Sequence, residues 1–197
     1  MPTAHPDFTR FYSVLGNAAV FVPWQGNVLR QSAPRYQSLP YRFTGTGSLQ
    51  AGGRWNVQGL MPTIYASADP ATLAAEVNQR WARYGWTPAQ HRAQLIVGMR
   101  WELQAVVDLT ARATLRALGV TTTRLTGCNW EAEQNAGREA LTQAIARAAF
   151  EWRAEGLVVP SARHRRGINL VYFPTHHRDG TQILTPDEAN VPFVHGL

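Results

Sequence analysis

The stretch from Gly52 to Glu76 constrains the fold most, because it predicts a strand, a turn and a helix in immediate succession. The apolar run 63–66 has the length of a short buried strand. Asp69 and Pro70 follow it, and these residue types are preferred at the N-cap and at the first position of a helix. We therefore expect a strand over 63–66 that turns directly into a helix beginning at Pro70.

The predicted helix, from Pro70 to about Tyr84, carries one carboxylate beside its apolar face. At about 100° per residue, the side chains of Leu73, Val77, Trp81 and Tyr84 share one face. Glu76 lies roughly 60° from Leu73 by the same arithmetic, so its carboxylate can reach a cleft beside the core. The alternative is a solvated surface glutamate, since Glu is seldom buried.

Length and composition indicate one globular domain. The chain has 197 residues, of which 45% are hydrophobic and 16% charged, which suits a protein with a sizeable core. The apolar runs are too short for a membrane span, and Met1–Pro6 lacks the features of a secretory signal. The single Cys128 excludes an internal disulfide and a cysteine zinc cluster. We expect a cytoplasmic protein in which Cys128 is a buried structural thiol.

The positive charge of the chain comes entirely from arginine. Formal net charge is +6, and all 19 Lys+Arg residues are arginines. Arginine forks recognise phosphates and carboxylates better than lysine does. The charge predicts an anionic partner, which could be a dinucleotide, a nucleic acid or an acidic protein. A general arginine bias in the composition would explain it equally well.

Several short motifs follow one another with a characteristic spacing between about Arg42 and Phe173. They are Tyr41–Gly45, Gly52–Asn56, Ile64–Ala66, Ala74–Val77, Glu155–Ser161 and Asn169–Leu170. Each is weak alone, but in this order they resemble the RES-domain family, the toxin halves of bacterial toxin–antitoxin pairs. The first 40 residues have no clear counterpart in this comparison.

The resemblance implies an α+β fold similar to that of ADP-ribosyltransferases, with a mixed or antiparallel β core flanked by helices. It also implies that NAD is the substrate, not a cofactor, with inorganic phosphate as a co-substrate if the reaction is phosphorolysis and not hydrolysis. Some family members instead transfer ADP-ribose to a protein, which is the alternative enzymatic activity. The expected partner is a cognate antitoxin that covers the pocket, and the assembly is then a homodimer or a toxin–antitoxin hetero-oligomer.

Cleavage of the bond between nicotinamide and ribose passes through an oxocarbenium-like transition state, which a fixed carboxylate stabilises. The resemblance assigns that role to Glu76, with Arg54 and Tyr65 as further catalytic candidates. Cationic donors must hold the diphosphate, and an aromatic ring can pack on nicotinamide. The substrate-binding candidates are Arg42, Arg54, Tyr65, Asn56, Ser161 and Asn169.

Ser161 is interpreted as a residue that orients the substrate, because no Ser-His-Asp pattern accompanies it. The six histidines show no ligand spacing such as His-Glu-x-x-His, so no metal is expected. The basic loop Arg163–Arg166 is assigned either to substrate phosphate or to antitoxin contact.

The remaining chain is predicted as one structural domain, with residues 1–40 as an N-terminal arm and 41–197 as the catalytic part. We expect a turn at Trp24–Asn27, a flexible glycine-rich loop over 44–53, strands over 94–101 and 105–110, a short helix from Thr110 to Leu118, a loop over 121–129, and one long helix over 132–154. Strands over 157–159 and 168–173 flank the basic loop.

A third functional alternative is a basic toxin that binds or cleaves RNA. The arginines favour it, but no RNA-binding motif or ordered aromatic platform is visible, so direct contact with nucleic acid is not the preferred prediction.

Overall fold

A mixed sheet, whose strands pair in a closed ring, forms the centre of the protein. The computed structural model describes residues 2–17, 20–32, 44–83, 85–87, 95–185 and 194–195. The strands are β1 (Phe21–Ser32), β2 (Ile64–Ser67), β3 (Leu95–Asp108), β4 (Gly156–Pro160), β5 (Ile168–Tyr172), β6 (Gln182–Leu184) and β7 (Val194–His195). Their order is β1-β2-β5-β4-β3, and β1 pairs with β3 again to close the ring. Among the described strand pairs, only β3 and β4 run parallel, and β6 and β7 add to β3.

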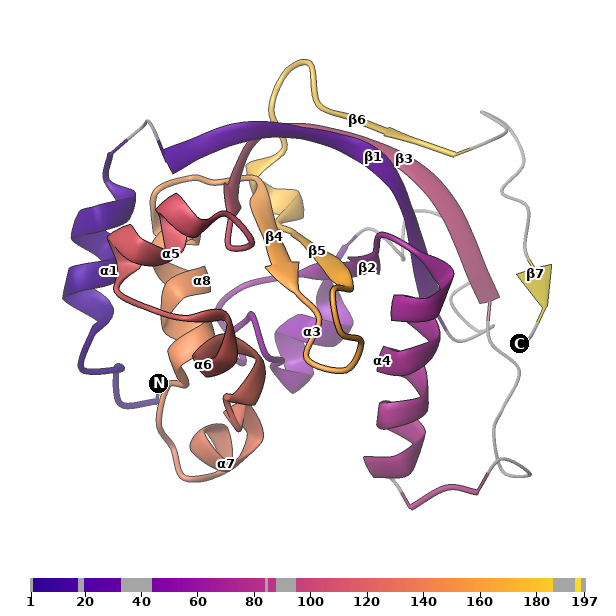
Figure 1. Ribbon diagram of the computed structural model, residues 1–197, viewed down its shortest axis with the longest axis horizontal. Helices are drawn as coiled ribbons and strands as arrows, with labels where there is room; N and C mark the ends of the chain where they lie inside the picture. Colours follow the sequence, from indigo (N-terminus) through magenta and orange to yellow (C-terminus); the bar gives the residue numbers. More distant parts are fainter. Residues whose placement is uncertain are drawn as a thin grey trace.

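The two long strands, β1 and β3, run side by side and curve together over the rest of the molecule (Figure 1). Their pairing extends from Phe21 opposite Val107 to Ser32 opposite Leu95. The turn predicted at Trp24–Asn27 is wrong, because these residues lie inside β1. The backbone hydrogen bonds of a neighbouring long strand outweigh the local turn preference of this segment.

The predictions of separate strands over 94–101 and 105–110 are also wrong, since β3 is continuous from Leu95 to Asp108. The segment predicted as an N-terminal arm supplies β1 and the helix α1 (Phe8–Leu15). Residues before position 40 therefore contribute a strand to the central sheet.

Successive side chains of the short strands point to opposite faces of the sheet, and each face packs into a different hydrophobic cluster. On one face, Ile64, Leu170 and Tyr172 pack with Trp101 of β3 and Val28 of β1. On the other face, the alternate residues Leu157, Val159 and Val171 pack with α1 and with α8 (Leu141–Glu151). Buried apolar surface on both faces fixes the register of these strands, because a slip by one residue would exchange the two sets.

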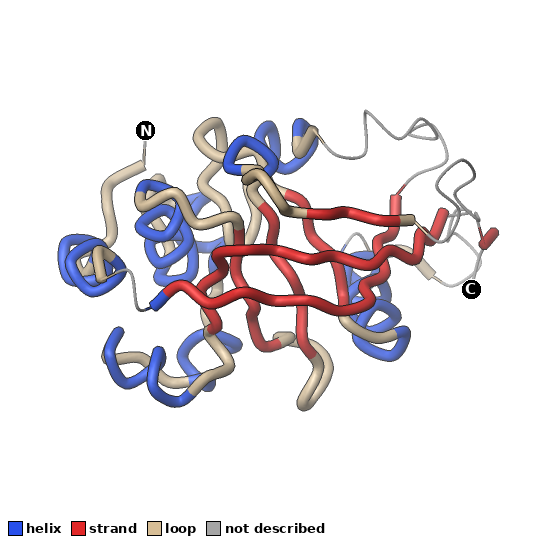
Figure 2. Tube along the Cα trace, turned by 90° about the horizontal axis from the view of Figure 1, so that it is seen from above, coloured by secondary structure: helices blue, strands red, loops and turns tan. Residues whose placement is uncertain are grey.

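The helices lie at both ends of the sheet (Figures 1 and 2). Those at one end are α1, α5 (Arg112–Leu118), α6 (Thr122–Gly127), α7 (Trp130–Asn135) and α8, whereas α4 (Pro70–Arg83) lies at the opposite end. A short helix, α3 (Thr46–Ala51), precedes β2, and a 3-10 turn, η4 (Pro174–His176), follows β5.

The single helix predicted over 132–154 is wrong. The chain forms α7 and α8 with a break between them, in which Gly137 takes the left-handed φ of 70°. A glycine adopts this conformation without steric cost, so it ends α7. The side chain of Gln143 then accepts a hydrogen bond from the backbone of Ala140 at 3.0 Å and begins α8.

Two predicted loops contain helices. Residues 44–53 include α3, and residues 121–129 include α6, whose first turn is capped by the hydroxyl of Thr121. Both helices have six residues, and helices this short carry little periodic signal in a sequence.

The structure confirms the expected α+β class. It also confirms the strand at 63–66, the helix from Pro70, the strands on either side of the basic loop and the helix ending at Leu118. The last of these begins after Ala111, not at a Thr110 cap. None of the helices in the described ranges is both long enough and apolar enough to cross a membrane.

Candidate functional site

The carboxylate of Glu76 is the centre of a polar cluster built from three elements. Its Oε1 accepts hydrogen bonds from the Ser161 hydroxyl at 2.7 Å and from the Asn169 amide at 2.8 Å. Glu76 comes from α4, Ser161 follows β4, and Asn169 lies in β5. The structure therefore brings together three of the predicted site residues by direct contact.

The order of the strands explains this meeting. Strand β5 lies between β2 and β4, so Asn169 is opposite Ser67 on one side and Val159 on the other. The Ser67 hydroxyl donates to the side-chain oxygen Oδ1 of Asn169 at 2.8 Å. The side-chain nitrogen Nδ2 of Asn169 is then directed at Glu76. Ser67 was not among the predicted site residues, although its place at the end of the predicted strand was a usable signal.

Only one oxygen of the Glu76 carboxylate is bound in this way. Within the described part of the chain, no hydrogen bond reaches Oε2, and the side chain is half-buried. The carboxylate is thus fixed through one oxygen and has no described donor at the other, which we call its open oxygen. Such a group can stabilise a positive charge that develops beside it.

The Ser161 hydroxyl is fully engaged. It donates to Glu76 and accepts from the backbone amides of Arg163 at 3.1 Å and His164 at 3.0 Å. Its proton is directed at a carboxylate and its lone pairs at the following loop, so it connects Glu76 to the backbone of that loop.

A second contact ties the same loop to the first turn of α4. Asp69 accepts the Thr72 amide at 2.8 Å and the Thr72 hydroxyl at 2.6 Å, and that hydroxyl lies 2.9 Å from Nδ1 of His164. Since the hydroxyl proton points to Asp69, His164 is the donor in the last contact. The hydrogen bonds from Thr72 lower the pKa of Asp69. The N-cap was predicted, but the link to His164 was not.

Arg54 holds the end of α6. Its Nη1 donates to the carbonyl oxygens of Leu125 at 3.0 Å and Cys128 at 2.9 Å, with Thr126 at 3.4 Å. These carbonyls lie at a helix C-terminus, where a cation is favoured. Burial lowers the pKa of the guanidinium. The charge of Arg163 lowers this pKa further, whereas the charge of Glu76 raises it. Arg54 therefore lies in the electrostatic reach of the Glu76 cluster and also has a structural contact.

The side chains of Tyr65 and Asn56 are hydrogen-bonded to each other next to Gly53. The Tyr65 hydroxyl donates to Oδ1 of Asn56 at 2.7 Å and accepts the amide of Trp55 at 3.0 Å. Burial raises the pKa of Tyr65. A Cβ on Gly53 would lie 2.7 Å from the Tyr65 hydroxyl oxygen and 2.6 Å from Oδ1 of Asn56, so this position requires glycine.

Asn56 is fully buried, and its amide donates to the carbonyl oxygen of Ser48 in α3. The structure thus places Asn56 in a supporting contact. Tyr65 is half-buried as a residue and packs against the buried core, on the same side of β2 as Ser67. Arg42 lies outside the described residues.

A pocket of about 580 Å³ borders the cluster on the side of the basic loop. Its lining includes Ser161, the loop 162–167, Ile168, and three threonines contributed by other segments, Thr110, Thr122 and Thr126. The pocket therefore reaches a side chain that is hydrogen-bonded to Glu76.

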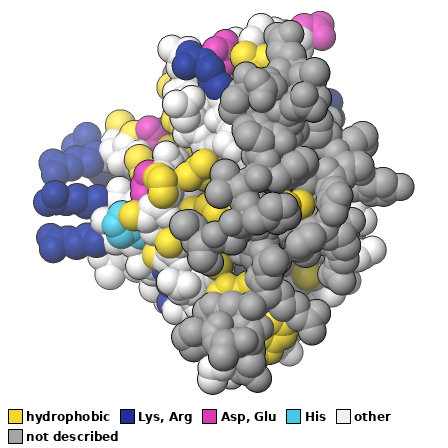
Figure 3. Space-filling view, turned by 90° about the vertical axis from the view of Figure 1, so that its right-hand side faces the viewer, with side chains coloured by type: hydrophobic (Ala, Val, Ile, Leu, Met, Phe, Trp, Pro, Cys, Tyr) yellow, Lys and Arg dark blue, Asp and Glu magenta, His cyan; other side chains and the backbone are white. Residues whose placement is uncertain are grey.

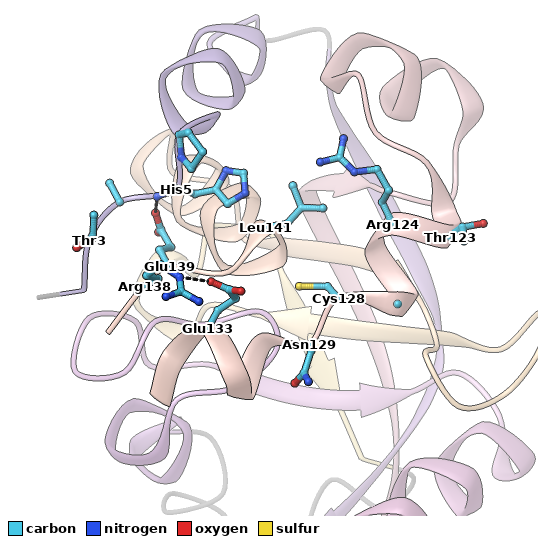
Figure 4. A pocket seen from close by; sticks show the side chains of 13 residues that line it. Thr3, His5, Thr123, Arg124, Cys128, Asn129, Glu133, Arg138, Glu139 and Leu141 are labelled. Atoms are coloured by element: carbon cyan, nitrogen blue, oxygen red, sulfur yellow. Dashed lines mark hydrogen bonds and ion pairs between the residues drawn. The ribbon is translucent and has the colours of Figure 1, made fainter. Parts of the chain in front are cut away.

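A larger pocket of about 790 Å³ lies between the N-terminal segment and helices α6 to α8 (Figure 4). His5, Arg124, Cys128 and Leu141 are among its lining residues. Cys128 is half-buried at this wall, not fully buried as expected. None of the predicted site residues lines this pocket, so the Glu76 cluster is kept as the candidate site. Across the described residues, His, Cys, Asp and Glu form no group of three suited to a metal ion.

Comparison with known families gives a direct match. The RES domain model matches residues 28–194. The chain belongs to the RES-domain family. The matched region begins within β1, and so extends further toward the N-terminus than the motifs that suggested the resemblance.

Two curated RES-domain relatives are the NAD(+) phosphorylase MbcT of Mycobacterium bovis and that of Mycobacterium tuberculosis. Each is 29% identical over 143 residues, which cover 66% of this chain and 69% of the relative. A chain of the crystal structure of the M. tuberculosis MbcT-MbcA toxin–antitoxin complex has the same fold, with a TM-score of 0.70 at 23% identity over 90% of both chains.

Proposed function

We propose that this RES-domain protein is the toxin of a bacterial toxin–antitoxin pair and that it degrades NAD by cleaving the bond between nicotinamide and ribose. The observation that carries the proposal is the Glu76 carboxylate, held through Oε1 by Ser161 and Asn169 and open at Oε2. When nicotinamide leaves, positive charge develops on the ribose. A preorganised carboxylate beside the sugar stabilises that charge without rearranging during the reaction.

Phosphorolysis is the form of the reaction that we favour, because the two mycobacterial relatives are named NAD(+) phosphorylases. A phosphate oxygen forms a bond to the anomeric carbon of the nicotinamide ribose. The carbon–nitrogen bond breaks, and its electron pair stays on nicotinamide, which leaves as a neutral molecule. The products are nicotinamide and ADP-ribose 1″-phosphate. No group needs to protonate nicotinamide, which fits a site with one carboxylate.

The other parts of the site have supporting roles in this proposal. Arg54 lies in the field of Glu76 and offers further N–H groups to the diphosphate, since its hydrogen bonds to the end of α6 use only Nη1. The ring of Tyr65 provides a surface for nicotinamide. Arg42 stays a candidate from the sequence for the diphosphate.

The test is incubation of the purified protein with NAD, with and without inorganic phosphate, followed by product analysis. We expect ADP-ribose 1″-phosphate and nicotinamide only when phosphate is present. Free ADP-ribose in both conditions would indicate hydrolysis, and transfer of labelled ADP-ribose to a protein would indicate a mono-ADP-ribosyltransferase. Unchanged NAD in both conditions would contradict the proposal.

The proposed partner is an antitoxin, because the fold matches a chain solved as part of a toxin–antitoxin complex. In this proposal the antitoxin protects the host by covering the Glu76 site. Co-expression provides the test in cells, since a cognate partner should restore the growth of cells that produce this protein.

A further inference from the structure

The loop between β4 and β5 gathers positive charge at the pocket beside Ser161. Arg163, Arg165 and Arg166 all line this pocket, and its lining residues include no carboxylate. All three side chains are exposed, and within the described ranges none of them forms an ion pair. In Figure 3, arginine side chains project together from one edge of the molecule, next to a histidine. Unpaired arginines around one hollow are suited to an anion.

The backbone of this loop is held in a defined shape. The amide of Ser161 donates to the Gly167 carbonyl at 2.8 Å, and the amide of Gly167 donates to the His164 carbonyl at 2.9 Å. The His164 ring is fixed to Thr72 of α4. Arg166 takes a φ of 67°, in the left-handed region that favours glycine. The surrounding hydrogen bonds hold the loop in this backbone conformation despite its cost.

The lining of the pocket also includes threonines from outside the basic loop. Thr122 is exposed in α6 and lines the pocket, while Thr126 donates to its carbonyl oxygen at 3.0 Å. The hydroxyl of Thr110, the third lining threonine, donates to the carboxylate of Asp108 at 2.6 Å. Asp108 itself is not one of the lining residues. Guanidinium and hydroxyl donors in one lining match the several acceptor oxygens of a tetrahedral oxyanion.

This pocket is connected to the reacting centre by one side chain. Ser161 lines the pocket, and its hydroxyl lies 2.7 Å from Oε1 of Glu76. Arg163 also lies close enough to Arg54 for its charge to lower the pKa of that guanidinium. An anion in the pocket would therefore lie next to the cluster and would relieve the repulsion between these two arginines.

We propose that Arg163, Arg165 and Arg166 form a binding site for a phosphate group. The proposal rests on the proposed function, in which the phosphate group is either inorganic phosphate about to attack the sugar or part of the diphosphate of NAD. Both sources share the same chemistry, and kinetic constants distinguish them. Contact with a carboxylate of a protein partner is the competing outcome.

The decisive comparison uses two double variants with the same change in net charge. Arg165→Gln with Arg166→Gln removes two pocket arginines, whereas Arg116→Gln with Arg153→Gln removes two exposed arginines outside the pocket. Phosphate binding is measured by calorimetry without NAD, at constant ionic strength. We expect the pocket variant to bind inorganic phosphate at least about tenfold more weakly and the control to match the unaltered protein, since a charged hydrogen bond contributes about 1.5–3 kcal/mol.

Steady-state rates of NAD loss then show which phosphate group the pocket binds. A tenfold rise in the phosphate concentration for half-maximal rate, with an unchanged KM for NAD, identifies inorganic phosphate. A rise confined to the KM for NAD identifies the diphosphate. If the pocket variant binds phosphate normally and keeps both the normal phosphate concentration for half-maximal rate and the normal KM for NAD, the proposed phosphate site is wrong even though NAD is consumed. If only binding of the protein partner is lost, the loop is a protein contact. Phosphate binding that depends on the loop in a protein that consumes no NAD would instead contradict the proposed function and leave the site in place.

Discussion

At the residue scale, Glu76 combines fixed position with an open oxygen. A Glu76→Gln variant keeps an oxygen that can accept from Ser161 and Asn169, but it loses the negative charge. We expect kcat for NAD loss to fall by about 100-fold or more, because the developing oxocarbenium loses its counter-charge. The thermal midpoint should stay within about 4 °C of the unaltered protein. Near-normal turnover by the folded variant would remove Glu76 from the mechanism.

Thr72 is the second residue whose role is local. A Thr72→Val variant keeps the shape but removes the hydroxyl that joins Asp69 to His164. We expect the free energy of unfolding to fall by about 1 kcal/mol and kcat/KM to fall as well, because the loop carrying Ser161 loses its anchor. Thr114→Val, at a half-buried helical position in α5, is the matched control in chemical denaturation. Equal stability and activity in the two variants would contradict the anchor.

The same substitution has a consequence for pH. The folded protein lowers the pKa of Asp69 below its ordinary value of 3.8, chiefly through the Thr72 hydroxyl. The carboxylate therefore stabilises the fold above that value, and the contribution is lost as pH falls through the lowered pKa. In Thr72→Val the pKa of Asp69 should rise toward 3.8, which a titration followed by NMR of the carboxyl carbon measures. An unchanged pKa would show that the backbone amide of Thr72 alone holds it.

At the scale of elements, Arg54 links the Gly52–Asn56 motif to the C-terminal end of α6. Arg54→Ala leaves the carbonyl oxygens of Leu125 and Cys128 without their donor, so we expect a loss of about 1 kcal/mol in stability. It should also weaken NAD binding more than Arg163→Ala does, because Arg54 belongs to the Gly52–Asn56 motif and interacts electrostatically with both Glu76 and Tyr65. Calorimetry with NAD in the absence of phosphate measures the difference. Equal dissociation constants for the two variants would assign Arg54 to structure alone.

At the scale of the whole molecule, positive charge borders a carboxylate site that is open to a ligand. Arg54 and the loop Arg163–Arg166 give this region the character of an anion receptor. A partner that covers it should insert a carboxylate. We expect an antitoxin to raise the apparent KM for NAD, and excess NAD to slow its binding. An antitoxin that lowers turnover without changing NAD binding would contradict occlusion.

Those parts of the site that depend on neighbours in the chain could be predicted from residue types and spacing. The strand at 63–66, the Asp69 cap and the helix carrying Glu76 follow from residue preferences that act over a few positions. The family also followed from motifs in order, and the RES domain match confirms it.

Contacts between groups far apart in the chain depend on strand pairing and packing, which local residue patterns do not reveal. Gly26 lies inside a long strand because β3 pairs with it, and a turn preference cannot reveal a partner about 75 residues away. Ser67, Thr72 and His164 joined the site because β5 lies between β2 and β4, which directs the basic loop toward α4. The sequence named Glu76, Ser161 and Asn169 separately, but long-range packing alone placed two donors on one carboxylate oxygen and left the other oxygen open.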